Sequence, residues 1–261
     1  DETPFFVSLV DGAREAARRH NVTLLVEYAG DDDALQSSQI RSLVARGASA
    51  LLVNPVSDAV VQEIENAARA GIPVFTIDRS AATNAIVSHV ASDNLAGGSM
   101  AGEYLAEVLD RRGKVVEITG TPGSSAARDR GAGFHQALAA YLDIEVIAQE
   151  TGNFRRSDGK EAFARLLAEH PDIDGVFAHN DDMVLGAIEA AREAGRANDI
   201  SFVGFDAIEE AIVALEEGRL RATVAQRPAE MGRIGVETAF AYLQGEHVPT
   251  SILVDLALIT R

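Results

Sequence analysis

Two stretches of the chain carry the same pattern of polar residues after apolar strands. The first reads GASALLVNPVSDAVVQEIENAARAGIPVFTIDR, and the second reads DIDGVFAHNDDMVLGAIEAAREAGRANDISFVGFD. In each stretch an apolar run leads to an asparagine (Asn54 or Asn180). A helical segment follows, and the next apolar run leads to an aspartate (Asp78 or Asp206). Amides and carboxylates form directional hydrogen bonds, so this internal repeat predicts a binding site for a polar ligand, built from two halves.

The other candidate ligand contacts are polar or aromatic side chains near the ends of expected elements. An arginine paired with an aspartate offers fixed hydrogen-bonding geometry to hydroxyl groups, and aromatic rings cover apolar ring faces. A ligand rich in hydroxyl groups would suit such a set. The candidates are Phe5, Phe6, Asn54, Asp78, Arg79, Arg130, Phe154, Asn180, Phe205, Asp206 and Gln226.

Each candidate also has a purely structural interpretation. An Asn or Asp after a strand is often a turn residue or a helix N-cap, and Phe6 has the helical spacing of a core residue. Arg130 lies close to Arg128 on an expected helix, where an arginine is ordinarily at the surface. Phe154 is different because the polar loop GNFRR gives an aromatic ring little structural purpose.

The elements that must position these residues alternate between short β-branched runs and amphipathic helices, which predicts an α/β fold with parallel sheets. The first helix is expected to have Thr3 as N-cap and Pro4 at its first position, and to end near His20. Ligands of parallel sheets bind beyond the carboxyl ends of the strands. Strands are expected at 23–28, 49–53, 73–77, 86–91, 113–119, 144–149, 173–178, 201–205, 221–226 and 252–258.

Composition and missing motifs narrow the function classes. The chain has 23 basic and 40 acidic residues, and its formal net charge of -17 disfavours nucleic acid as a partner. Without cysteine it has no disulfide or catalytic thiolate, and its longest apolar runs are far shorter than the roughly 20 residues that span a bilayer.

The sequence has no Walker A loop, dinucleotide fingerprint or G-x-S-x-G elbow. The Asp181-Asp182 pair is interpreted as the charged start of a helix rather than a metal site, and we expect no cofactor, no metal and no catalytic residue.

Together these residues resemble the bacterial D-ribose-binding proteins of the type I periplasmic binding family. The resemblance runs nearly from end to end. It rests on the segments PFFVSL (4–9), LVNP (52–55), IDR (77–79), VSHVASDN (87–94), SAARDRG (125–131), FAHND (177–181), VGFD (203–206) and AQ (225–226).

The resemblance implies a fold of two similar doubly wound parallel-sheet lobes, joined by a hinge of three segments near 92–93, 226–227 and 254–255. The lobes would comprise 1–92 plus 227–253, and 93–226 plus 254–261. Phe5, Phe6 and Phe154 would sandwich a sugar ring, with D-ribose as the first candidate, and the polar candidates would bind its hydroxyls.

The resemblance also implies what the protein does with the sugar. It would be a monomer in the periplasm, or another extracytoplasmic compartment, after removal of a signal peptide. Closure on the sugar would let it dock on the membrane permease of an ABC transporter, with a chemoreceptor as a further candidate partner. It would perform no chemistry on the ligand.

Two features depart from the family pattern. Thr3 stands where asparagine is usual, which leaves ring and anomer preference open. Family members also have a central strand before Pro4, which is absent here, and without it two rows of backbone groups would have no partners. We therefore expect that the sequence is a truncated or misannotated version of a longer one, or that another segment fills the place of this strand.

Two functions from other classes stay open at this point. The effector-binding core of a sugar-responsive transcription regulator has the same fold, and an upstream helix-turn-helix would indicate it. An enzyme of doubly wound fold would need a nucleophile, a metal or a cofactor loop, and turnover of a pentose would reveal it.

Overall fold

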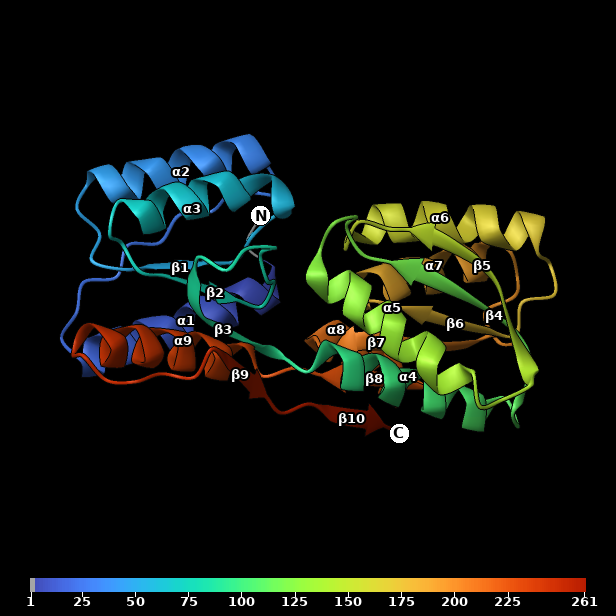
Figure 1. The fold of residues 1–261 in the computed structure, drawn as a ribbon. Helices are drawn as coiled ribbons and strands as arrows, with labels where there is room; N and C mark the ends of the chain where they lie inside the picture. The colour runs from blue at the N-terminus through green and yellow to red at the C-terminus, as the bar shows by residue number, and fades with distance from the viewer. Residues whose placement is uncertain (1–2) are drawn as a thin grey trace. The chain divides into compact units, whose positions relative to one another are not determined.

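The computed structural model describes residues 3–261, which form two compact units (Figure 1). Unit 1 comprises the chain as far as Ser92, together with Gly123–Ser125 and Arg227–Asp255. Unit 2 comprises Asp93–Pro122, Ala126–Gln226 and Leu256–Arg261. Each unit is built on a mainly or wholly parallel sheet with helices on its faces, which confirms the predicted fold class.

Unit 1 has a four-stranded parallel sheet in the order β1-β2-β3-β9. Figure 1 shows α2 and α3 on one face of this sheet and α1 and α9 on the other. The strands are β1 (Leu51–Val53), β2 (Val74–Ile77), β3 (Ile86–Ser92) and β9 (Ser251–Val254). The helices are α1 (Pro4–Arg19), α2 (Asp33–Ala45), η1 (Asp58–Val60), α3 (Val61–Arg69) and α9 (Pro228–Leu243).

Unit 2 has a six-stranded sheet in the order β10-β8-β7-β6-β4-β5, in which β10 runs antiparallel to β8 and the other described pairs are parallel. The strands are β4 (Arg112–Thr119), β5 (Asp143–Thr151), β6 (Gly175–Ala178), β7 (Ser201–Asp206), β8 (Ala222–Ala225) and β10 (Ala257–Thr260). The helices are α4 (Asn94–Val108), α5 (Ser125–Leu138), α6 (Arg156–Glu169), α7 (Asp181–Glu193) and α8 (Glu209–Glu216).

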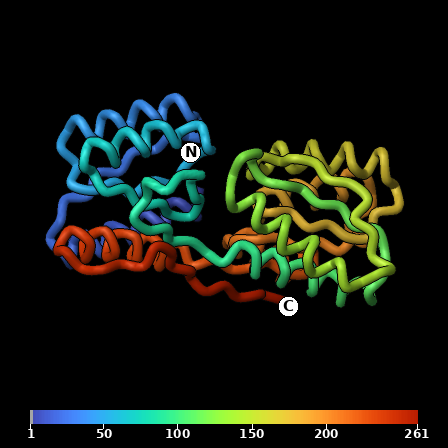
Figure 2. The backbone as a smooth tube through the Cα atoms, in the orientation of Figure 1, coloured from blue at the N-terminus to red at the C-terminus, as the bar shows by residue number. Residues whose placement is uncertain are grey.

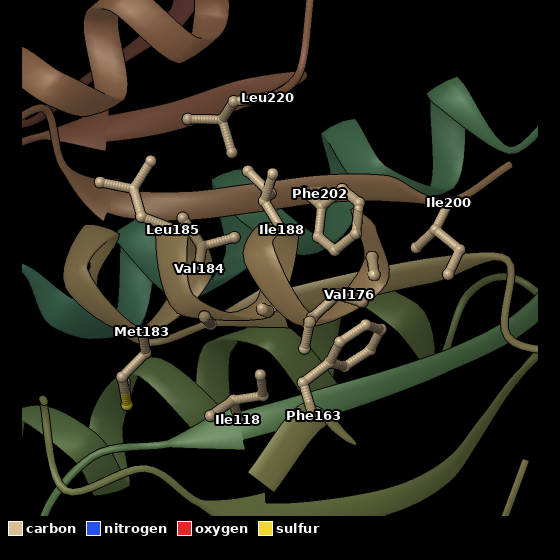
Figure 3. Packing of buried hydrophobic residues seen from close by; sticks show 14 of the residues in the cluster. Ile118, Phe163, Val176, Met183, Val184, Leu185, Ile188, Ile200, Phe202 and Leu220 are labelled. Carbon is tan, nitrogen blue, oxygen red and sulfur yellow. The ribbon is translucent and has the colours of Figure 1, made fainter. Parts of the chain in front are cut away.

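The core of unit 2 lies on both faces of its sheet. Every residue of β6 is buried, because a parallel strand covered on both faces reads as a continuous apolar run. Along β4 the side chains alternate, so Val116 and Ile118 join the cluster formed with α6 and α7 (Figure 3), whereas Val115 joins the cluster beneath α4 and α5. Glu117 shares the face of Val115 and is fully buried there.

Two strand predictions are wrong. Residues 23–28 form no strand, because a strand needs a neighbour for its backbone groups and, within 3–261, β1 pairs only with β2. Leu24 and Val26 instead pack against apolar clusters of unit 1, against which Leu52 of β1 also packs. The expected strand at 252–258 is divided into β9 and β10, which belong to different sheets.

The remaining strand predictions are confirmed to within two residues at each end, and so is the first helix. Thr3 occupies the N-cap position of α1, although its side chain makes no capping hydrogen bond, and the helix ends at Arg19. None of the described helices is both long enough and apolar enough to span a membrane.

Two glycines allow α1 and α9 to pack closely, although the helices come from opposite ends of the chain (Figure 2). A Cβ atom on Gly12 would lie 1.9 Å from the carbonyl oxygen of Ala229, and one on Gly232 would lie 1.9 Å from that of Leu9. Backbone atoms cannot move aside as a flexible side chain can. Any larger residue at either position would therefore force the helices apart.

We expect Gly232→Ala to destabilise the protein by about 1–3 kcal/mol through overpacking. The higher helix propensity of alanine stabilises a helix by about 1 kcal/mol relative to glycine, and we expect this gain to be smaller than the cost of overpacking. Urea unfolding measures the net effect, with Arg18→Ala on the exposed side of α1 as a control expected to change stability by less than about 0.5 kcal/mol. A stabilised Gly232→Ala variant would show that the helices can separate at little cost.

Candidate ligand-binding site

Three polar candidates follow two neighbouring strands of unit 1. Asn54 comes directly after β1, and Asp78 and Arg79 come directly after β2. Because β1 and β2 are parallel neighbours, their carboxyl ends meet at one edge of the sheet. The Asn54 Nδ2 group donates to Asp78 Oδ2 at 3.1 Å, and the backbone N–H of Arg79 donates to Asn54 Oδ1 at 3.3 Å. The structure therefore brings these three candidates together.

The charged pair of this group is largely buried. Asp78 is 5% exposed and Arg79 is 8% exposed, with 3.9 Å between Asp78 Oδ2 and Arg79 Nε. Asp78 has a φ of 63°, a left-handed conformation that aspartate adopts more readily than most residues. The Arg79 Nη1 group also donates to the carbonyl oxygen of Val56 at 3.3 Å. Backbone geometry and hydrogen bonds together hold both charges in place.

Gln36 of α2 holds the turn that carries Asn54. Its side-chain amide donates to the carbonyl oxygen of Asn54 at 2.7 Å and accepts from the backbone N–H of Val56 at 2.8 Å. Gln36 is not among the candidates predicted from the sequence. It lies in an ordinary polar helix segment, and nothing local marks its contact with a turn 18 residues away.

Phe5 and Phe6 lie in the first turn of α1, and their rings meet edge to face with centroids 5.3 Å apart. Both side chains are partly exposed, and Phe5 also packs against an apolar cluster of unit 1. The two rings and the three polar residues are the candidates that lie on unit 1. We call Phe5, Phe6, Asn54, Asp78 and Arg79 the unit 1 set.

In unit 2 the central candidate is Arg130 of α5, which is 3% exposed. Its Nε group donates to Asn94 Oδ1 at 2.8 Å, and its Nη1 group donates to the carbonyl oxygen of His179. The same Nη1 atom lies 3.6 Å from Asp206 Oδ1. Arg130 is thus not the surface residue that its helical setting suggests, whereas Arg128 is exposed.

Two aromatic rings face the guanidinium of Arg130. Its Cζ atom lies 3.7 Å from the ring centroid of Phe205 and 5.8 Å from that of Phe154. Phe205 is fully buried, and a Cβ atom on Gly97 would lie 2.6 Å from its ring. Phe205 therefore supports Arg130 from the core side, through a cation–π contact.

Asn180 has a structural role as well as a place among the candidates. It is the N-cap of α7, where its Oδ1 atom accepts from the backbone N–H of Met183 at 3.0 Å. Its Nδ2 group donates to the carbonyl oxygen of Phe154 at 3.2 Å. Phe154 has a left-handed φ of 59°, and its ring lies so close to Gly120 that a Cβ atom there would be 2.0 Å away.

Asp206 and Gln226 complete the candidates on unit 2. Asp206 ends β7, Gln226 follows β8, and the Gln226 Nε2 group donates to Asp206 Oδ1 at 2.6 Å. Because β7 and β8 are parallel neighbours, their ends meet as those of β1 and β2 do. We call Arg130, Phe154, Asn180, Phe205, Asp206 and Gln226 the unit 2 set.

Asp181 was interpreted as part of a charged helix start, but its side chain is fully buried. Its Oδ2 atom accepts from the backbone N–H of Ile208 at 3.0 Å, and its Oδ1 atom accepts from Thr223 Oγ1 at 2.8 Å. Burial, together with the charge of Asp206, raises the pKa of Asp181 well above its usual value despite these hydrogen bonds. Asp181 thus holds the turn that follows Asp206, a role that is not among those predicted from the sequence.

The two sets have the same chemical balance. Each contains one aspartate and one arginine, so its formal charge is zero, and each adds at least one side-chain amide and two aromatic rings. Hydroxyl groups both donate and accept hydrogen bonds, and amides, carboxylates and guanidinium groups together can bind them in both ways. This arrangement suits an uncharged molecule with several hydroxyl groups and an apolar face. Within residues 3–261 there is no group of three or more His, Asp or Glu residues placed to hold a metal ion.

The fold and these residues define a class of protein. The family model described as a periplasmic binding protein domain matches residues 1–247, and the chain belongs to that family. It is 43% identical to the ribose import binding protein RbsB of Escherichia coli over 259 residues, which cover 99% of this chain and 87% of that protein. It is 40% identical to the RbsB protein of Bacillus subtilis over 259 residues, which cover 99% and 84%.

Solved structures agree with this assignment. A periplasmic solute-binding protein of an ABC transporter from Actinobacillus succinogenes, with bound D-allose, superposes with a TM-score of 0.92 at 27% identity. The match covers 100% of this chain and 94% of that one. The predicted resemblance to ribose-type periplasmic binding proteins is therefore confirmed.

The raised pKa of Asp181 predicts how stability depends on pH. Since the folded-state pKa exceeds the unfolded value of about 3.9, this group stabilises the fold fully below that value. The contribution is lost as the pH rises through the folded-state pKa. We expect the unfolding free energy of the wild type, relative to Asp181→Asn, to decrease as the pH rises from 4 to 8. Urea unfolding at several pH values measures both curves, and parallel curves would contradict the assignment.

Proposed function

We propose that this chain is the solute-binding protein of a sugar ABC importer and that it binds a single monosaccharide, D-ribose before other sugars. The observation that carries this proposal is the pair of charge-balanced sets, each with an aspartate at the carboxyl end of a parallel strand, an arginine close to it, a side-chain amide and aromatic rings. The names of the RbsB relatives, at 40–43% identity, favour ribose.

In this proposal both sets contact one sugar molecule. The polar residues bind its hydroxyls, and Phe5, Phe6 and Phe154 cover its ring, while the fully buried Phe205 acts through Arg130. The lobes comprise 1–92 plus 227–253 and 93–226 plus 254–261, and they close on the sugar about the hinge segments. A closed state stabilised by ligand contacts is the usual way in which such proteins respond to their ligand.

The remaining parts of the proposal concern what happens after binding. A monomer in an extracytoplasmic compartment delivers the sugar, in its closed form, to the membrane permease of the transporter, and a chemoreceptor is a second candidate partner. The protein leaves the sugar chemically unchanged. This part is supported by relatives that are import binding proteins. NMR of a pentose incubated with the protein checks it, because a new sugar signal would indicate an enzyme instead.

We expect D-ribose to raise the melting temperature more than other sugars do. A ligand that binds only the folded state stabilises it by about 2.7 kcal/mol at one hundred times its Kd. A thermal-shift screen against aldopentoses, hexoses including allose and galactose, and polyols measures this directly. A larger shift with another sugar would replace ribose as the ligand, and no shift with any of them would contradict the sugar-binding proposal.

Substitution of Arg130 tests the site within the same protein. We expect Arg130→Ala to weaken ribose binding at least about thirtyfold, because truncating one partner of a buried, hydrogen-bonded charge pair costs about 2–5 kcal/mol. Arg128→Ala removes the same side chain from the exposed side of the same helix, and its Kd should match the wild type. Isothermal titration calorimetry measures both affinities. An unchanged Kd in folded Arg130→Ala would remove this residue from the site.

A further inference from the structure

A buried carboxylate lies beside the unit 2 set without belonging to it. Glu117 is in the middle of β4, on the face covered by α5, and its side chain is 0% exposed. Its Oε1 atom is 2.6 Å from His179 Nε2, and its Oε2 atom is 2.8 Å from His135 Nε2. A Cβ atom on Gly131 of α5 would lie 2.9 Å from Glu117 Oε1, so the helix packs directly over this group.

The hydrogen bonds of His179 fix the position of its proton. The backbone N–H of Gly120 donates to His179 Nδ1 at 3.3 Å, so Nδ1 acts as an acceptor. The ring hydrogen of the neutral imidazole is therefore on Nε2, where it is donated to Glu117. His179 is 1% exposed, and its ring joins β4 to the loop that begins at Gly120.

The same residues hold parts of the unit 2 set. Gly120 lies against the ring of Phe154, and no side chain would fit between them. The carbonyl oxygen of His179 accepts from Arg130, and the next residue in the chain is Asn180. A displaced His179 would therefore move a ligand-facing ring, a guanidinium partner and a side-chain amide together.

The charge state agrees with this geometry. Burial works to raise the pKa of Glu117, but the hydrogen bonds and the electrostatic interactions with the His179 and His135 rings outweigh it and leave this pKa below its usual value. Burial lowers the pKa of His179, and Glu117 only partly offsets this effect. The charged or titratable groups that act on the pKa of His179 are Glu117 from β4 and Arg130 and His135 from α5. Glu117 is thus a carboxylate at neutral pH, and His179 is a neutral imidazole.

We propose that Glu117 and His179 are positioning residues of the sugar site: Glu117 orients the imidazole of His179, which fixes the backbone at Gly120 and at His179 and so places Phe154, Arg130 and Asn180. This proposal rests on the proposed function of the chain as a sugar-binding protein. It assigns a binding role to two residues that do not themselves face the ligand.

The first experiment separates this role from a general contribution to stability. Glu117→Leu keeps the volume but leaves the His179 Nε2–H without its acceptor, and we expect the Kd for D-ribose to rise about tenfold or more. Ile173→Ala removes a buried side chain that precedes β6, whereas His179 follows it, and should lower the melting temperature with a Kd within about twofold of the wild type. Equal losses of affinity in the two variants would overturn the proposal.

A second experiment tests whether a conservative replacement of both Glu117 and His179 restores sugar binding. Glu117→Gln combined with His179→Gln provides one amide donor and one amide acceptor in place of the imidazole and the carboxylate. We expect this double variant to recover most of the affinity that Glu117→Leu loses. The lowered pKa of His179 makes the wild type less stable as the pH drops below about 6.5. The double variant lacks this histidine and should therefore lose less stability than the wild type between pH 7 and 5.

A measurement without sugar keeps the test independent of the ligand's identity. Amide hydrogen exchange followed by NMR should show faster exchange at Gly120 and Thr121 in Glu117→Leu than in the wild type, with no such change in Ile173→Ala. Unchanged exchange at Gly120 would overturn the positioning role, even if the wild type binds ribose. If the wild type binds no sugar at all, the proposed function fails, while this measurement still decides whether Glu117 fixes the loop.

Discussion

The buried guanidinium of Arg130 places a strong constraint on the structure of unit 2, because an ion removed from water costs several kcal/mol unless partners replace the lost hydration. The partners are the side chain of Asn94, the carbonyl oxygen of His179 and the carboxylate of Asp206. The ring of Phe205 covers one face of the guanidinium. The backbones must approach closely to allow this: a Cβ atom on Gly98 would lie 2.0 Å from the carbonyl oxygen of Arg130. One side chain thus links α4 to the ends of β6 and β7.

Such an arrangement is a poor way to gain stability. Replacing a buried ion pair with apolar residues is often neutral or even stabilising by about 1–4 kcal/mol. The device nevertheless occurs in both units, as Asp78 with Arg79 and as Asp206 with Arg130, each near the carboxyl ends of parallel strands. In both units the aspartate has a positive φ and accepts from a side-chain amide. Under the proposed function, this repeated cost serves recognition of a polar ligand rather than folding.

Local patterns were sufficient to predict the strands that are buried on both faces, since a continuous apolar run with polar residues at its carboxyl end is a short-range signal. Local patterns did not predict features that depend on residues far away in the sequence. Residues 23–28 have the composition of a strand, but no neighbour forms a ladder with them in the described part of the chain. The burial of Arg130 contradicts its helical setting because its partners come from other elements. A glutamate within the apolar run of β4 is an unusual feature that the sequence does show. Its partner His179, however, lies 62 residues further along the chain.

The rigidity of the two sets decides where a sugar would be recognised most strictly. The carboxylates of Asp78 and Asp206 are held by their left-handed backbones and by the amides of Asn54 and Gln226. A ligand hydroxyl that misses such a fixed acceptor cannot be met by a small side-chain adjustment, and each buried polar group left unpaired costs about 1–3 kcal/mol. In the proposed site Phe154 would contact the sugar through an apolar ring face, which has no comparable directional requirement. Discrimination between sugars that differ at one stereocentre should therefore arise at the two aspartates, while the rings set affinity with less regard to stereochemistry.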